Sequence, residues 1–174
     1  QRQMCIRDRD REGIIRGNEP EGNWTYYYPD GREDFRFDYG SGLDRVRIAE
    51  LEVRNDLYFK IGKNKPYTGI VVESGGLKDY LLLGRFQAGR RDGQWVQWYR
   101  NGQKEVEGTY YRGKKNGDWS LWYEDGTMKE KGTFDMGEID GTYKYWYANG
   151  HLHMEQSYES CLLYTSPSPR DLAV

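Results

Sequence analysis

Aromatic, apolar and glycine residues recur along this chain with a period of 24 residues, over residues 84–151. In the middle unit, alternation predicts a β-strand with Trp119 and Leu121 on one face and Ser120 and Trp122 on the other. Trp, Tyr and β-branched residues are frequent in these segments, as strands prefer. The recurring positions are Gly84, Gly108 and Gly132; Phe86, Tyr110 and Phe134; Gly89, Gly113 and Gly137; Trp95, Trp119 and Tyr143; and Trp98, Trp122 and Trp146.

Each unit also contains two dipeptides of Asn or Asp followed by glycine. They are Asp92-Gly93, Asn116-Gly117, Asp140-Gly141, Asn101-Gly102, Asp125-Gly126 and Asn149-Gly150. Such dipeptides favour the type I′ hairpin turn, whose two central residues need positive φ, so we expect two chain reversals per unit. Because a lone hairpin is marginal in water, the units are expected to stack edge to edge. The sequence therefore predicts an all-β fold, an elongated single-layer antiparallel meander of repeated β-hairpins.

The repeat pattern also suggests domain boundaries. Residues 10–42 form an upstream repeat unit, since Gly22, Trp24, Tyr27-Tyr28 and Asp30-Gly31 keep the internal spacing of the later units. Residues 43–57 lack the repeat and are expected to be a linker or short helix. Residues 58–160 form the β-hairpin repeat array, which opens with a degenerate unit at residues 66–72 that ends at Gly75-Gly76.

Both ends of the chain resemble translated sequencing adapters. Residues 1–9 and 161–174 back-translate to codons similar to the two opposite-end adapters of a widely used transposase-based kit. We expect both segments to be non-native, with residues 10–160 a fragment of a longer gene. Cys5 and Cys161 lie in these segments, so no disulfide, thiolate metal site or cysteine nucleophile is expected.

Composition supports a turn-rich β protein. Aromatic residues make up 16% of the chain, and 22 of its 174 residues are glycine. That glycine share is nearly twice the usual value of roughly 7% and indicates many turns. The formal net charge of −2 gives no support for nucleic-acid binding, which favours a basic patch. No apolar run approaches the roughly 18 residues of a membrane span.

The repeat resembles a known family. The run from Gly108-Thr109-Tyr110 through Gly117-Asp118-Trp119 to Tyr123-Glu124-Asp125-Gly126 is similar to the variant MORN repeat. Leu57-Tyr58-Phe59-Lys60, followed by Pro66-Tyr67-Thr68-Gly69, resembles the bacterial YwqK-type proteins, often labelled toxin–antitoxin antitoxins. The resemblance covers roughly residues 53–152. It implies a single-layer β-hairpin array and a bacterial origin, and it implies little about activity.

Catalytic chemistry has few candidates. The chain has two histidines, so hydrolase triads are nearly excluded and we expect no enzyme activity. His151, His153 and Glu155 alternate along an expected strand and could together ligate a metal. A solvated strand is the simpler explanation, so neither a metal nor a cofactor is expected.

An aromatic ladder is the first candidate binding surface. Trp98, Trp122 and Trp146 are expected on one face of the sheet, with Tyr99, Tyr123 and Tyr147 on the opposite face. Contiguous exposed aromatic surface commonly marks a binding site. Cross-strand aromatic pairs can equally form the core of the repeat, and both roles stay open.

A pair of basic residues recurs at one repeat position, in the loop expected before the first Asp/Asn-Gly turn. The pairs are Arg90-Arg91 and Lys114-Lys115, and stacked units would align them against an anionic surface. The third unit has Glu138-Ile139 there, which favours a solvated loop.

These features predict a non-catalytic repeat scaffold that mediates protein–protein interaction, of which an antitoxin-like role is one form. The partner is then another protein and not a nucleic acid. The alternative is an envelope-associated module that binds anionic lipid or cell-wall glycan through the basic residues or the aromatics. Cytoplasmic and envelope locations both stay open.

Overall fold

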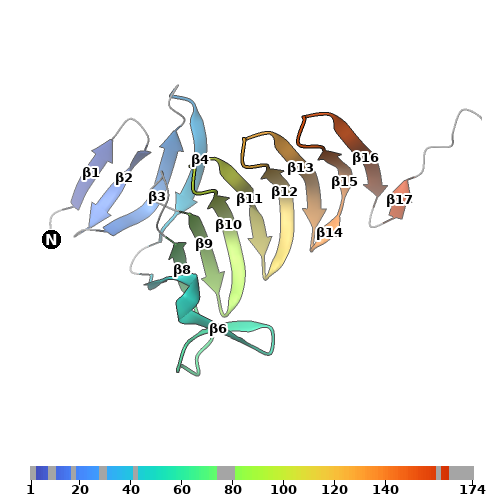
Figure 1. Cartoon of the computed structure of the whole chain (residues 1–174). Helices are drawn as coiled ribbons and strands as arrows, with labels where there is room; N and C mark the ends of the chain where they lie inside the picture. The colour runs from blue at the N-terminus through green and yellow to red at the C-terminus, as the bar shows by residue number, and fades with distance from the viewer. Residues whose placement is uncertain are drawn as a thin grey trace, which may run out of the picture. The chain divides into compact units, whose positions relative to one another are not determined.

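The computed structural model describes residues 3–7, 11–16, 19–27, 31–40, 43–73, 81–159 and 162–164 (Figure 1). Apart from turns and one 3-10 turn, η1 (Ile48–Glu50), these residues lie mostly in antiparallel strands, so the predicted all-β hairpin meander is confirmed. The chain divides into two units, Gln1–Arg45 and Val46–Val174. Within the ranges above, no helix has the length and apolarity needed to cross a membrane.

Some predicted features fall outside the described residues. They include the Gly75-Gly76 turn and Cys161. Strands β1 (Gln3–Arg7) and β17 (Leu162–Tyr164) lie within the predicted adapter segments. The origin of those two segments stays a prediction.

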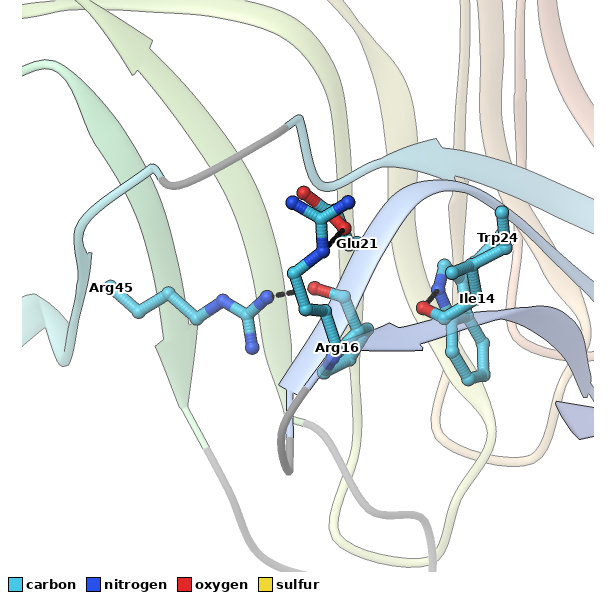
Figure 2. Close-up of polar contacts among 6 residues, drawn as sticks. Ile14, Arg16, Glu21, Trp24 and Arg45 are labelled. Atoms are coloured by element: carbon cyan, nitrogen blue, oxygen red, sulfur yellow. Dashed lines mark hydrogen bonds and ion pairs between the residues drawn. The ribbon is translucent and has the colours of Figure 1, made fainter. Parts of the chain in front are cut away.

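The first unit is a sheet of four consecutive antiparallel strands, and the indole ring of Trp24 lies in its core. Trp24 is 2% exposed, and its Nε1 donates to the carbonyl of Ile14 at 3.0 Å (Figure 2). Arg16 and Glu21 form an ion pair of 3.0 Å between neighbouring strands (Figure 2). The strands are β1, β2 (Arg11–Arg16), β3 (Glu19–Tyr27) and β4 (Glu33–Asp38).

The second unit contains the repeat array as one continuous sheet (Figure 1). Its order is β17-β16-β15-β13-β12-β11-β10-β9-β8-β5, with β14 paired to β13, so from β8 onward neighbours in sequence are neighbours in space. The strands are β5 (Arg45–Val46), β8 (Gly69–Glu73), β9 (Leu82–Gln87), β10 (Arg90–Trp98), β11 (Lys104–Tyr111), β12 (Lys114–Trp122), β13 (Met128–Asp135), β14 (Glu138–Ile139), β15 (Gly141–Trp146), β16 (Leu152–Glu159) and β17.

A small hairpin spans the predicted boundary between the linker or short helix (residues 43–57) and the repeat array (residues 58–160). After η1 the chain forms β6 (Leu51–Arg54) and β7 (Leu57–Lys60), which pair only with each other as strands. The Tyr58 ring packs on Phe86 at 4.7 Å between centroids, and the Tyr58 amide donates to the Gly89 carbonyl at 2.8 Å. This hairpin therefore covers the start of the repeat sheet.

The chain reversals between units differ from the predicted ones. Ala88-Gly89, Arg112-Gly113 and Met136-Gly137 have positive φ at both residues, as a type I′ turn requires. The Asp92-Gly93 position instead lies inside β10, where the pairing with β9 shifts register between Arg91 and Trp95. The prediction of a turn at Asp92-Gly93 was therefore wrong, because a glycine with positive φ also serves a β-bulge.

The second Asn/Asp-Gly position is a turn of another type. Only the glycine of Asn101-Gly102 has positive φ, at 84°. The Gly102 amide donates to the Tyr99 carbonyl at 2.9 Å, and the Asn101 Oδ1 accepts the Gln103 amide at 2.9 Å. This pattern is a type I turn followed by a glycine bulge, and it recurs at Gly126 and Gly150.

A glycine beneath an aromatic ring links successive strands. Trp95 lies opposite Gly84 on one neighbouring strand and opposite Gly108 on the other. A Cβ atom added to Gly84 would overlap the Trp95 ring, and one added to Gly108 would overlap the Trp119 ring. The same overlap occurs at Gly13 beneath Trp24 and at Gly132 beneath Tyr143. The glycine therefore provides the space in which the ring lies flat on the sheet.

We expect Gly108→Ala to destabilise the chain by about 1–3 kcal/mol, because overpacking forces the Trp119 ring from its position. Chemical denaturation of the full chain measures this loss. In a Trp119→Leu background the same change should cost clearly less, since the ring that blocks the new methyl group is gone. An equal loss in both backgrounds would contradict the ring-on-glycine explanation.

Candidate functional site

The candidate site is a groove on one face of the repeat sheet in the second unit. A hollow of about 690 Å³ extends over parts of β8 to β12. We call it the aromatic groove and define it by Arg91, Trp95, Tyr110, Lys115, Trp119 and Leu121, which all line it. The adjacent strand residue Ser120 lines a separate polar depression with Asp118, as alternation along β12 requires.

A continuous row of edge-to-face rings forms the floor of the aromatic groove. Trp95 contacts Phe86 at 5.6 Å and Tyr110 at 5.8 Å between ring centroids. Trp119 contacts Tyr110 at 4.9 Å and Phe134 at 6.5 Å. Each such pair is worth roughly 0.5–1.5 kcal/mol beyond its buried area. The row therefore couples β9 through β13 into one rigid surface.

Arg91 sits among three of these rings. Its guanidinium carbon lies 4.8 Å from the centroid of Trp95, 5.3 Å from Tyr110 and 5.7 Å from Tyr58. Its terminal nitrogens donate to the hydroxyls of Tyr110 at 3.1 Å and Tyr58 at 3.2 Å, while its Nε is buried without an acceptor. Neutral hydroxyls thus supply all its hydrogen bonds among the described residues, and its charge is balanced only by ring faces.

Lys115 repeats this arrangement one unit later. Its Nζ lies 4.6 Å from the centroid of Trp119 and 4.9 Å from that of Phe134. No carboxylate of the described chain pairs with it. The groove therefore has two ring-bound cations at equivalent positions of successive units.

The predicted basic pairs are split between the two faces of the sheet. They are the first two residues of β10 and of β12, so their expected position in a loop was wrong. Arg91 and Lys115 line the groove, while the side chains of Arg90 and Lys114 are exposed. Alternation along each strand separates the members of a pair.

The predicted tryptophan ladder lies at the opposite end of the hairpins. A register shift falls directly before each of its residues, between Gln97 and Trp98 in the first unit. Trp98 is 4% exposed and lines the groove together with Gln97, whereas Trp122 and Trp146 are half-buried. Because a bulge interrupts alternation, the facing assigned to these tryptophans from period-two counting does not apply.

Tyrosines next to this ladder connect the units. The hydroxyl of Tyr99 donates to the Trp122 carbonyl at 2.9 Å, and that of Tyr123 donates to the Trp146 carbonyl at 2.9 Å. Tyr123 also shares a hydrogen bond with Tyr145, at 3.3 Å. That hydrogen bond, assisted by burial, raises the pKa of Tyr123 to about 12.

The histidine set has ordinary partners. The His153 ring packs on Tyr147 at 4.3 Å between centroids, and Glu155 pairs with Lys144 at 2.9 Å. Within the described ranges, no group of three His, Cys, Asp or Glu side chains is arranged to hold a metal ion.

The sequence interpretation missed two residues of the site, Tyr58 and Tyr110. Tyr110 was recognised as a repeat position but not as a partner of Arg91, although Arg91 and Lys115 stand at one repeat position between aromatic ones. That interleaving of cations and rings was the available signal. Tyr58 precedes the first recognisable repeat unit, and no spacing could have placed it here.

The alkaline side of the stability profile should depend on Tyr123. Its pKa rises from 10.0 to about 12 on folding, so the native state holds the proton longer than the unfolded state. This contribution to stability is constant below pH 10.0 and is lost as the pH rises to about 12. We expect Tyr123→Phe to flatten that loss in denaturant melts, with Tyr111→Phe as the control. An unchanged pH profile in Tyr123→Phe would contradict this role.

Comparison with known proteins agrees with the repeat geometry. A search of curated proteins finds no match for the chain. The family model described as MORN repeat variant matches residues 91–110, 115–136 and 139–160. The first two matched segments contain Arg91 and Lys115 and, apart from Tyr58, the rings that hold them. The array from residue 91 to residue 160 is therefore built of three segments similar to the MORN repeat variant.

Proposed function

We propose that this chain is a non-catalytic scaffold that binds another protein in the aromatic groove. The observation that carries the proposal is the composition of the groove. Half-buried Tyr110 and Leu121 line the hollow with the packed rings of Trp95 and Trp119, and Arg91 stands beside them. Trp, Tyr and Arg dominate the energetic centres of protein interfaces. Because neighbouring rings already hold these side chains, little ordering entropy opposes binding.

Photo-crosslinking from the groove tests this proposal. We expect a photoreactive phenylalanine analogue at Leu121 of the full chain to capture discrete proteins from an extract of the source organism. The matched control carries the analogue at Ser120, the preceding residue, which lines the opposite face. Mass spectrometry of the adducts identifies the partner. The same adducts from both positions, or none from Leu121, would count against binding in the groove.

An antitoxin-like role is the finer form of this proposal. It rests on the resemblance to the YwqK-type proteins and not on the geometry of the groove. In that role the occupant is a toxin encoded beside this gene. Capture of the product of a neighbouring gene at Leu121 supports the role, and capture of unrelated proteins alone speaks against it.

An anionic lipid surface is a second candidate, supported by one end of the hairpins. Tyr111 and Met136 are 45% and 40% exposed at consecutive type I′ turns. Arg90, Arg112 and Lys114 are exposed at the same row of turns. Basic residues beside exposed apolar ones are typical of segments that bind at membrane interfaces.

We expect the full chain to co-sediment with phosphatidylserine vesicles. Arg90→Gln with Lys114→Gln should weaken this roughly thirtyfold, since each basic residue contributes about 1 kcal/mol near an anionic surface. Arg91→Gln with Lys115→Gln removes the same charge from the opposite face and is the control. Equal sedimentation with neutral and anionic vesicles would exclude an electrostatic lipid site.

A further inference from the structure

The aromatic groove contains two cations that lack an anionic partner. Arg91 donates only to tyrosine hydroxyls and has a buried Nε without an acceptor, and Lys115 contacts only ring faces. Neither has a further partner among the described residues. A half-buried charge of this kind forms strong hydrogen bonds when a carboxylate reaches it, because little solvent competes. At these two residues the groove therefore has positive charge that no anion of the described residues balances.

The repeat fixes the spacing of the two backbone positions that carry the cations. Arg91 lies on β10 and Lys115 on β12, with β11 between them, so two interstrand spacings, about 10 Å, separate their positions. The equivalent residues of the flanking units are Tyr67 and Ile139, neither of which is basic. The other charged residues of the lining, such as Glu73 and Glu105, lie toward the opposite ends of the strands. Arg100, the third basic residue of the lining, also lies at that opposite end, just after β10. Arg91 and Lys115 are therefore the two positive charges at their own end of the groove.

We propose that the occupant of the aromatic groove is an acidic amphipathic helix of a partner protein, with two carboxylates seven residues apart. This inference rests on the proposed protein-binding function and names the chemistry of the partner. Residues seven apart lie on one face of an α-helix and about 10.5 Å apart along its axis, which matches the two cations. The residues between them on that face are apolar and meet the groove at Tyr110, which lies on β11 between the two cations.

A β-strand fits the pair less well than a helix. Side chains on one face of a β-strand lie about 7 Å or about 13 Å apart, on either side of the required spacing. A polyproline II segment places every third side chain about 9.3 Å apart on one face, which is close to the required value. The two conformations are therefore compared directly in the experiment.

Fluorescence anisotropy with labelled synthetic peptides and the full chain tests the proposal. The probe is a stapled helical peptide with glutamates seven residues apart and leucine between them on the same face. We expect it to bind roughly ten- to hundredfold more tightly than its glutamine version, as two charge-assisted contacts imply. It should also bind more tightly than a version with glutamates four residues apart. Equal binding of the glutamate and glutamine versions would overturn the proposal.

Matched variants of the chain assign the effect to the two cations. Arg91→Gln with Lys115→Gln should lower affinity for the glutamate peptide to that of the glutamine peptide. Arg90→Gln with Lys114→Gln removes the same charge from the other face and should leave the affinity unchanged. Because Arg91 also holds two tyrosines, Lys115→Gln alone is measured as well, and circular dichroism melts check folding. An equal loss of affinity in both double variants would show that only the net charge of the chain matters. That result would overturn the proposal.

The outcomes separate this inference from the proposed function. Tighter binding of a proline-rich peptide with glutamates three residues apart would replace the helical occupant by an extended one. Specific adducts at Leu121 together with no preference for acidic peptides would preserve protein binding and reject the acidic partner. No adducts at Leu121 would reject protein binding, whatever the peptides do.

Discussion

The array depends on the contact between a glycine on one strand and an aromatic ring on the next. In the single-layer part of the sheet, beyond the hairpin of β6 and β7, a ring gains burial mainly by lying on its own sheet. The spacing from Gly84 to Trp95, from Gly108 to Trp119 and from Gly13 to Trp24 is the same, and each ring fills the space that a Cβ would occupy. A hairpin without its neighbour would expose either the ring or the glycine backbone. Stability is therefore shared between adjacent hairpins, as in other repeat proteins.

Ring faces that the sheet leaves open are covered by basic side chains. The charged ends of Arg91 and Lys115 lie over the rings of Trp95 and Trp119, and both side chains line the groove. A hydrophobic residue is compatible with this position, since Ile139 occupies the equivalent place opposite Phe134 in the third unit. The cations are thus not needed for burial alone. Their charge is a property of these two units and not of the fold.

Much of the fold could be predicted from the sequence, because a 24-residue period of glycines and aromatics is compatible with little except repeated hairpins. The wrong predictions, of the turns and of the facing of side chains, share one physical cause. A glycine at positive φ serves a type I′ turn, a bulge and a hairpin closure alike, so Asp92-Gly93 and Asn101-Gly102 could not be told apart by composition. Bulges then reset the alternation before Trp98, and the facing of side chains beyond them could not be counted from sequence.

The position of Arg91 shows where function can differ between arrays of the same repeat. Four successive units have different residues at one repeat position: Tyr67, Arg91, Lys115 and Ile139. In each unit a glycine follows two residues later. The scaffold tolerates all four side chains, because the glycines and rings around them carry the packing. A sheet of this kind can therefore change its charge pattern along the groove without changing its fold. Recognition resides in the order of the residues at such positions, and the repeat supplies only their spacing.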